Sequence, residues 1–314
     1  MKNTDYSILE YDLKVVENFP LSFQPYYVDY VNASLNGEIR LFETNGVYIC
    51  FIVRKKFGFP FVHLISELFT LENSEIDTTT FFHHLAYYFR LIRVISVFPP
   101  QHLHTYKEAP KGAKRYSLGI IQLDLVPSKD SIYMNFKSVY RRHIKSAQKE
   151  GVHVEFGLHL FDEFYTFYES RMQSNNAVYD SKSTLQKIVE SAPENILCAV
   201  ARLNGTIEAV ILNIHDTTTA YYMWGASGIN SHNGSFRLLH WELIQKYLSK
   251  GIQHYSLGGY RLDEFKTKKQ ENLENFKLGF GAQIINGVHF NWVLQPFHYY
   301  LYQKISQLFH LLRR

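Results

Sequence analysis

Two Asn-Gly dipeptides, each set between strand-like apolar runs, constrain the fold of this chain more than any other feature of its sequence. Asn45-Gly46 lies within EIRLFETNGVYICFIVRKK (38–56), and Asn204-Gly205 joins ILCAVARL to TIEAVILNI. An Asn-Gly pair supplies the two positive-φ residues of a tight hairpin turn, so both segments are predicted to form antiparallel strand pairs. Each half of the chain should therefore contain antiparallel sheet.

The length of the chain favours two packed domains. It has 314 residues, of which 46% are hydrophobic, which excludes a disordered chain. We predict an amino-terminal domain over 1–128, joined by a returning tail at 296–314, and a carboxy-terminal domain over 129–295. Within the first domain, periodicity predicts a helix at 78–92 and a strand at 116–125.

The elements of the second half follow a regular order. A basic helix is predicted at 129–150, and Gly151 ends it. The order after it is strand, two helices, three strands, helix, strand, helix and a final hairpin. The predicted ranges are 152–156, 161–173, 182–191, 196–203, 206–214, 220–227, 235–250, 252–258, 271–279 and 282–294.

This order is that of the GNAT acyltransferase fold, a mixed sheet that splays after its fourth strand to admit an acyl donor. The first half resembles a degenerate copy of the same order, with a hairpin, a strand, a helix, a strand and a further strand. The predicted fold class is therefore α+β, with two GNAT-like domains whose mixed, largely antiparallel sheets are flanked by helices.

Three ordered motifs carry a resemblance to a known family. They are KSVYRRHIKSAQKEGV at 137–152, YSLGG at 255–259 and NFKLGFGA at 275–282, with the helix at 235–250 between them. Together they resemble the Fem family (FemABX-like), peptidoglycan-bridge aminoacyltransferases built as two GNAT-like domains. The resemblance covers about 115–295. The chain lacks the coiled-coil insertion that some members of the family carry. The resemblance does not extend to acceptor-side residues in the amino-terminal half.

The resemblance implies a function and one catalytic residue. The protein would move an aminoacyl group from aminoacyl-tRNA to an amine of a peptidoglycan precursor or related cell-envelope molecule, without a cofactor. It places Lys277 of the Phe-Lys-x-x-Phe-Gly motif near the reaction. Flanked by Phe276 and Phe280, this lysine would stabilise the oxyanion of the tetrahedral intermediate. The alternative is a surface lysine that extends past its aromatic neighbours.

The positive charge of the chain is local. The net charge is only +4, yet residues 107–149 hold ten Lys and Arg against three acidic residues. Lys137, Arg141 and Lys145 recur every four residues on the basic helix, and Arg142 lies beside them. We predict that these four residues bind the phosphates of an anionic substrate, a phosphate-bearing cell-wall or glycan precursor. A solvated helix that joins two domains is the alternative.

A second basic region follows the strand that ends in Gly258-Gly259. Glycines at a strand end allow a ligand to approach the backbone closely. We predict that these glycines bind the donor together with Arg261, Lys268 and Lys269, which would contact the phosphates of the aminoacyl-tRNA acceptor stem. A solvated loop is the alternative.

The usual CoA-binding loop is not matched. GNAT enzymes cradle the CoA pyrophosphate with Arg/Gln-x-x-Gly-x-Gly/Ala before their long helix, whereas this chain has GASGINSHNGSFR at 225–237. Glycines 225, 228 and 234 still leave a phosphate site open there. An acyl-CoA-dependent N-acyltransferase in nucleotide-sugar or surface-polysaccharide biosynthesis is therefore the alternative function. A non-catalytic RNA- or nucleotide-binding protein is the second alternative.

The general base is not identified by any pattern, and Asp263 and Glu264 are candidates only by position. No HExxH or CxxC motif accompanies the histidines, so no metal is expected.

The start of the chain lacks the pattern of a signal peptide, and both cysteines lie in apolar runs, which predicts a cytoplasmic protein. The tail at 296–314 is amphipathic and ends in Arg313-Arg314. We expect it to pack on the first domain, with peripheral membrane contact as the alternative.

Overall fold

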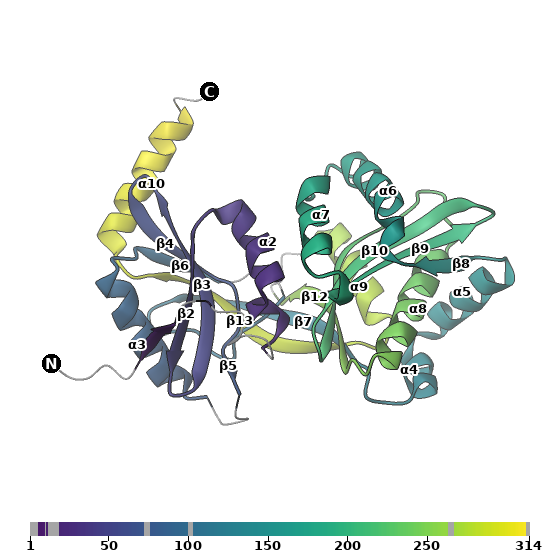
Figure 1. Ribbon diagram of the computed structural model, residues 1–314, viewed down its shortest axis with the longest axis horizontal. Coiled ribbons are helices and arrows are strands. Elements are labelled where there is room, and N and C mark those ends of the chain that lie inside the picture. The colour runs from purple at the N-terminus through teal and green to yellow at the C-terminus, as the bar shows by residue number, and fades with distance from the viewer. Residues whose placement is uncertain are drawn as a thin grey trace. The chain divides into compact units, whose positions relative to one another are not determined.

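The chain folds into two compact units in the computed structural model (Figure 1). Unit 1 comprises 1–119 and 286–314, and unit 2 comprises 120–285. The structure describes residues 6–9, 11, 19–71, 76–99, 103–262 and 267–311, with the side chains of Arg261 and His310 excepted. The chain passes between the units within strand β7 (Lys114–Asp124) and within β13 (Gln283–Val293). These crossings come about ten residues before the predicted boundaries at 128 and 295.

Unit 1 is a mixed sheet with helices. Its sheet order is β1-β2-β3-β4-β6-β13, with β5 paired to β3. The strands are β1 (Ser7–Leu9), β2 (Glu38–Thr44), β3 (Val47–Lys56), β4 (Phe59–Leu64), β5 (Phe69–Thr70) and β6 (Ser96–Phe98). The α-helices are α2 (Pro25–Leu35), α3 (Thr78–Leu91) and α10 (Pro296–Leu311), and a short 3-10 helix covers Leu21–Phe23.

The first predicted hairpin is confirmed. Strands β2 and β3 pair antiparallel around Asn45 and Gly46, whose φ angles are 53° and 72°. Helix α3, capped by Asp77, packs Phe81 and Phe89 into the core of this unit. Strand β4 lies where a strand is expected between the first hairpin and the helix at 78–92, whereas α2 has no counterpart among the predicted elements.

Unit 2 carries the order that the sequence predicts, except that two helices replace the single basic helix and one strand replaces the last hairpin. Its sheet order is β7-β12-β11-β10-β9-β8. The strands after β7 are β8 (His153–Phe156), β9 (Ile196–Leu203), β10 (Thr206–His215), β11 (Thr219–Ser227) and β12 (His254–Arg261). The α-helices are α4 (Lys129–Asn135), α5 (Ser138–Lys149), α6 (Phe161–Ser174), α7 (Lys182–Ser191), α8 (Ser235–Ser249) and α9 (Lys268–Leu278), and 3-10 helices cover Leu158–Leu160 and Pro193–Asn195.

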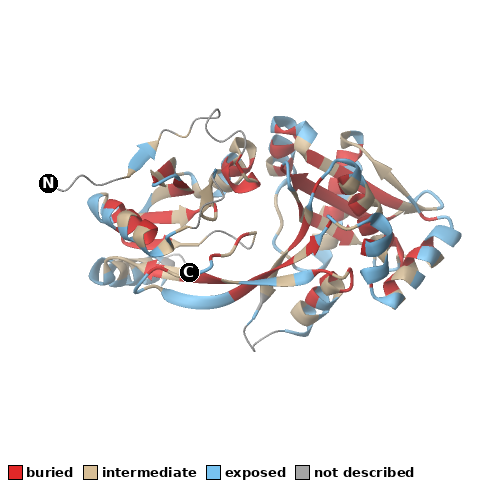
Figure 2. Cartoon of the chain, turned by 90° about the horizontal axis from the view of Figure 1, so that it is seen from below, coloured by how far each residue is buried: buried red, intermediate tan, exposed pale blue. Residues whose placement is uncertain are grey.

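The sheet of unit 2 is covered on both faces. Helices α6 and α7 lie on one side of it, and α5 and α8 lie on the other (Figure 1). Buried residues follow the strands and the inner sides of the helices (Figure 2). The second Asn-Gly hairpin is confirmed by the antiparallel pairing of β9 with β10.

The single basic helix predicted over 129–150 is wrong, because the chain breaks between α4 and α5. Phe136 is extended, with ψ 146°, and it is 2% exposed. Its ring packs against those of Trp241 and Phe280, at centroid distances of 5.4 and 5.3 Å. The backbone N–H of Lys137 then donates to the Gly279 carbonyl over 2.9 Å. Burial of one aromatic ring therefore outweighs continuation of the helix.

The hairpin predicted at 282–294 is also wrong, because β13 runs through it as one strand. Neither Asn286 nor Gly287 has a positive φ. A Cβ placed on Gly287 would lie 2.3 Å from Cβ of Thr105, and Tyr106 pairs with Val288 in an antiparallel bridge. The glycine therefore permits a close approach of two segments instead of a turn.

Candidate functional site

Strands β11 and β12 separate after a short parallel pairing. Only their first residues pair, ending at Tyr221 with Ser256, although the strands continue to Ser227 and Arg261. The register of β10 against β11 also shifts between Leu212 and Asn213, a bulge that bends the sheet before the separation. Unit 2 therefore has the splay that its element order predicts.

Lys277 and Gly258 meet beside this splay. Gly258, near the end of β12, has a φ of +83°, and a Cβ placed on it would lie 3.6 Å from Nζ of Lys277. Lys277 is on the last turn of α9, whose start is fixed by a capping box between Thr267 and Gln270. The structure thus joins the Gly-Gly strand end and the Phe-Lys-x-x-Phe-Gly motif, which are about twenty residues apart in the chain.

The ammonium of Lys277 is buried, so the alternative of a surface lysine is wrong. The residue is 8% exposed, and Phe276 and Phe280 flank it in the chain. Burial lowers the pKa of Lys277 to about 8, an effect that the carboxylate of Glu274 opposes. Among the residues that the structure describes, none forms a hydrogen bond or ion pair with this ammonium. The Lys277 ammonium is therefore mostly protonated at neutral pH, and its N–H donors have no partner in the described part of the chain.

A buried polar network lies behind the lysine. Nδ1 of His240 on α8 is 3.0 Å from the hydroxyl of Tyr255, which accepts a hydrogen bond from Nδ2 of Asn213 over 3.2 Å. Burial and the positive charge of Lys277 lower the pKa of His240 to about 3, so the ring is neutral.

Several atoms around this network lack partners. Nε2 of His240, Oδ1 of Asn213 and Oγ of Ser256 are buried without a hydrogen bond among the described residues. Buried polar atoms are normally paired, so the unpaired atoms of His240 and Asn213, two residues that both contact the Tyr255 hydroxyl, are typical of a site that binds a polar ligand. Ser256 follows Tyr255 in β12, so its side chain lies on the opposite face of the sheet. Sequence reasoning missed all three residues, because nothing local distinguishes them from core positions.

Arg237 is a further residue that sequence reasoning missed. Its guanidinium carbon lies 4.5 Å from the ring centroid of Tyr140 on α5 and 5.6 Å from that of Phe276 on α9. Its Nε is buried without a partner among the described residues. The spacing of Arg237 and His240, three residues apart on α8, was the available signal.

The amino terminus of α8 is occupied by the carboxylate of Glu208. This residue, 8% exposed, accepts hydrogen bonds from the hydroxyl of Ser235 over 3.1 Å and from the backbone N–H of His232. A Cβ on Gly234 would lie 2.0 Å from the carbonyl oxygen of His143. Gly234 is therefore required for the approach of α5 to α8, and the positive end of the helix already faces an anion.

The basic residues of α5 divide into two groups. Nη1 of Arg141 donates to the Met134 carbonyl over 2.6 Å and to the Phe136 carbonyl, so this guanidinium holds the end of α4. Lys137, Arg142 and Lys145 are exposed, and their side chains form no hydrogen bond or ion pair within the described part of the chain. The assignment of all four residues to substrate phosphates stays a prediction.

The predicted donor-binding residues are only partly brought together. Gly258 and Gly259 lie in β12, while Lys268 and Lys269 begin α9, about 13 Å along the helix from Lys277. Lys268 is 3.3 Å from the carboxylate of Glu271. The Arg261 side chain, and the candidate bases Asp263 and Glu264, lie outside the described residues.

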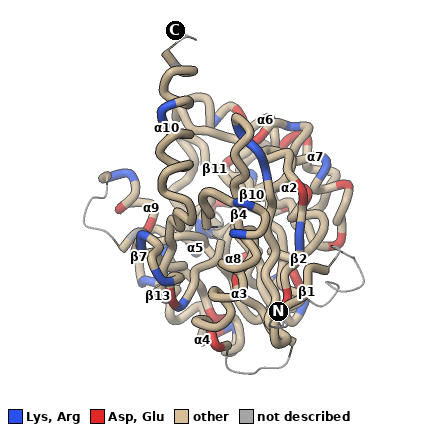
Figure 3. Tube along the Cα trace, turned by 90° about the vertical axis from the view of Figure 1, so that its left-hand side faces the viewer, with Lys and Arg blue, Asp and Glu red and all other residues tan. Residues whose placement is uncertain are grey.

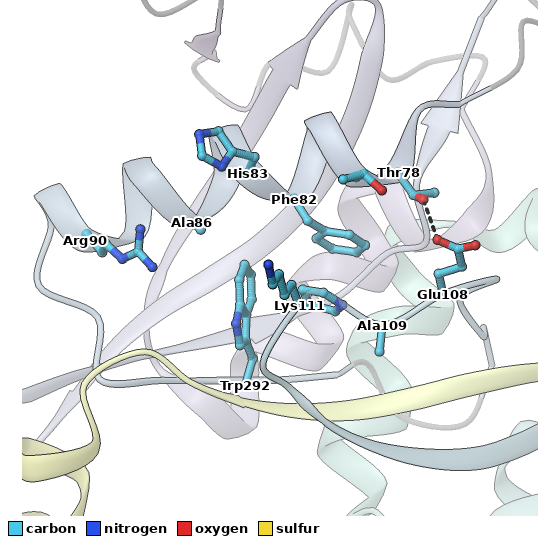
Figure 4. Close-up of a pocket in the computed structure, with 11 residues that line it drawn as sticks. Thr78, Phe82, His83, Ala86, Arg90, Glu108, Ala109, Lys111 and Trp292 are labelled. Atoms are coloured by element: carbon cyan, nitrogen blue, oxygen red, sulfur yellow. Dashed lines mark hydrogen bonds between the residues drawn. The ribbon is translucent and has the colours of Figure 1, made fainter.

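Unit 1 contains a groove of about 560 Å³ along α3 (Figure 4). Its lining combines buried apolar residues with exposed basic ones and a hydrogen-bonded pair. These are Phe82, Ala86 and Trp292; His83, Arg90 and Lys111; and Thr78, whose hydroxyl donates to Glu108 over 3.2 Å. The sequence did not predict this groove, because it joins one helix face to a distant loop and to β13. No group of three or more His, Cys, Asp or Glu residues suited to a metal occurs in the described ranges.

Comparison with known proteins agrees with this architecture. Residues 134–267 match the family described as "Acetyltransferase (GNAT) domain". The chain is similar in structure to FemX, with a TM-score of 0.70 at 12% identity, over 94% of this chain and 99% of FemX. No curated protein matches the sequence.

Two further solved structures are similar. One is the carboxy-terminal domain of a putative lysylphosphatidylglycerol synthetase from Agrobacterium fabrum, with a TM-score of 0.56 at 12% identity, over 88% of this chain and 89% of that one. The other is L-PGS from Bacillus licheniformis, with a TM-score of 0.52 at 12% identity, over 85% and 91%. The chain thus has a FemABX-like GNAT fold, and unit 2 carries an acyltransferase domain of the GNAT type.

Proposed function

We propose that this protein is an aminoacyltransferase that moves an aminoacyl group from aminoacyl-tRNA to an amine of a peptidoglycan precursor or related cell-envelope molecule. One observation carries the proposal: the buried, unpartnered ammonium of Lys277 faces Gly258 beside the splay of β11 and β12. The sequence motifs shared with the Fem family, the likeness to FemX and the likeness to a lysylphosphatidylglycerol synthetase domain support the kind of group transferred.

The chemistry needs a fixed positive charge more than a nucleophile. The acceptor amine attacks the ester carbonyl, and a C–N bond forms while the carbonyl oxygen becomes negative. The intermediate then collapses, the C–O bond to the ribose breaks, and the ribose oxygen takes up the proton that the amine loses. The Lys277 ammonium would stabilise the oxyanion, and its low exposure makes that interaction stronger than it would be in water.

The charges of unit 2 favour tRNA over CoA as the donor. Glu208 places a carboxylate at the amino terminus of α8, where the pyrophosphate of CoA would need a positive field. The unpaired Lys137, Arg142 and Lys145 on α5 instead suit a phosphate backbone or a phosphate-bearing acceptor. No cofactor is required for this reaction.

The alternative function is acyl-CoA-dependent N-acyl transfer in nucleotide-sugar or surface-polysaccharide biosynthesis. The match of residues 134–267 to the acetyltransferase family favours it. The negative charge of Glu208 at the amino terminus of α8 opposes it, because the pyrophosphate of CoA would need a positive field there. Non-catalytic binding of RNA or a nucleotide is the second alternative, and it would leave the unpaired Lys277 without a role.

Filter binding to a mixed aminoacyl-tRNA pool across a salt series, with acetyl-CoA as competitor, tests the donor. We expect salt-sensitive binding that prefers charged to uncharged tRNA and is unaffected by acetyl-CoA, and the retained tRNA would identify the amino acid. Stoichiometric binding of acetyl-CoA without tRNA binding would favour N-acyl transfer. Binding of tRNA with no transfer to any amine acceptor would favour the non-catalytic alternative.

A further inference from the structure

Helix α10 of unit 1 has two apolar faces, and only one of them is packed. On the packed face, the ring of Tyr302 lies 4.6 Å from that of Phe61 and 6.1 Å from that of Phe59. The ring of Phe309 lies 5.1 Å from that of Phe57 at the tip of the β3–β4 hairpin. These contacts attach α10 to the edge of unit 1, as Figure 1 shows.

The other apolar face is exposed. It consists of Phe297, Tyr300, Leu301, Leu308 and Leu311, with exposures of 73, 57, 41, 60 and 69%. At 100° per residue these positions fall within a stripe about 100° wide, on the side away from Tyr302. Packing within unit 1 therefore does not account for this stripe, and an exposed apolar surface of this kind marks an interaction site.

The charge around the stripe has one sign. Lys304 lies within it, and Lys55 and Lys56 end β3 at the adjoining hairpin, where Nζ of Lys56 is 5.9 Å from the ring of Tyr302. Neither 296–311 nor the β3–β4 hairpin at 47–64 contains a single Asp or Glu. Figure 3, in which acidic residues are red, shows none along α10.

We propose that α10 and the tip of the β3–β4 hairpin form a docking surface for an anionic lipid bilayer. Aromatic and leucine side chains would enter the boundary between headgroups and acyl chains, while the lysines contact lipid phosphates. Lys304 reaches the headgroups by extending its charged end out of the apolar stripe. The combination of apolar residues with cations, and the absence of acidic residues, selects a negatively charged bilayer over a protein partner.

The helix lies on the bilayer in this proposal and does not cross it. Within the described ranges, no helix is both long enough and apolar enough to traverse a membrane. The 16 residues of α10 extend for about 24 Å, and its packed face stays on β3 and β4. The docking surface belongs to unit 1 and does not include the splay in unit 2. The membrane proposal can therefore be tested separately from the proposed reaction.

Co-sedimentation of the full chain with vesicles tests the surface. Vesicles of phosphatidylglycerol and phosphatidylcholine are compared with vesicles of phosphatidylcholine alone. We expect binding to the anionic vesicles, weakened at least tenfold in Leu301→Gln/Leu308→Gln and about fivefold per charge in Lys304→Gln. The matched control is Leu71→Gln/Leu91→Gln, which removes two leucines of unit 1 that are 60 and 57% exposed and lie outside α10. This control should bind as the wild type does.

Two outcomes would overturn the proposal. One is equal sedimentation of wild type and Leu301→Gln/Leu308→Gln with anionic vesicles, when thermal unfolding shows both proteins folded. The other is a wild-type dimer in sedimentation velocity that the same substitution dissociates, with no vesicle binding. That result would assign the stripe to a second copy of the chain.

Discussion

Nζ of Lys277 lies within van der Waals contact of the side-chain position of Gly258, because a Cβ placed on that glycine would be 3.6 Å away from it. The positive φ of Gly258 and the capped start of α9 hold the two residues together from different elements. This contact places a desolvated cation directly against a strand end that opens away from its neighbour. Activity and stability should therefore respond differently to changes at these two positions.

Replacing Lys277 by Met should lower kcat about 10²- to 10³-fold and change substrate affinity little, because the charge acts on the oxyanion of the transition state. The fold should be retained, since Met fills a similar volume without a buried charge. Steady-state kinetics measure the effect, with Lys187→Met, an exposed lysine of α7 outside the predicted site, as the control. A Lys277→Met enzyme with wild-type kcat would remove this residue from the mechanism.

The pKa of Lys277, about 8, gives a pH dependence with a definite sign. Oxyanion stabilisation needs the protonated form, so kcat should fall as the pH rises through about 8. The free energy of unfolding should instead increase as the pH rises. The unfolded chain binds more protons between pH 8 and about 10.5, so the folded state gains up to about 3 kcal/mol across that range.

The measurement is urea unfolding of wild type and Lys277→Met at a series of pH values from 7 to 10.5. The stability advantage of the variant should shrink as the pH rises. A difference that stays constant with pH would show that burial does not perturb this lysine. Using the difference between two proteins cancels the titration of the tyrosines that both contain.

Local sequence patterns predicted the elements, and tertiary contacts decided the exceptions. Both Asn-Gly turns formed as predicted, because their conformation depends on two adjacent residues. Asn286-Gly287 did not turn, since the approach of Thr105 requires the glycine in an extended strand. Helix 129–150 broke because the ring of Phe136 reaches Trp241, more than one hundred residues away. The spacing of apolar residues within 129–150 does not reveal a contact with a residue so distant in the chain.

The candidate site could likewise be predicted from the sequence only in part. The motif residues Lys277 and Gly258 could be named from the sequence, and the structure brings them together. The partners of the buried network could not be named, because Asn213, His240 and Tyr255 come from three elements and meet only in the folded sheet. Glu208 at the start of α8 was missed for the same reason, since it comes from β10.

Gly258→Ala should be worse for activity than for stability. A positive φ costs an alanine about 1–2 kcal/mol, and the new methyl group would cover the face of Lys277 that an acyl carbonyl must reach. Gly46→Ala is the matched control, because Gly46 also has a positive φ, 72°, but has no atom within 4 Å of its Cβ position. Both variants should lose similar stability in urea unfolding, and only Gly258→Ala should lose turnover. Equal turnover in the two variants would contradict the assignment of this strand end to the site.

The cations of α5 separate into ligand-binding and structural roles by their salt dependence. Arg142→Gln/Lys145→Gln removes two exposed, unpaired charges, so the slope of log affinity for tRNA against log salt should decrease by about 1.4 to 1.8 without a change in thermal stability. Arg141→Gln should instead lower stability by about 1–3 kcal/mol, because the Met134 and Phe136 carbonyls lose their donor. Filter binding between 50 and about 200 mM salt and thermal unfolding measure the two effects. If the double variant keeps the wild-type slope, the α5 cations face solvent only, and tRNA must bind elsewhere on the protein.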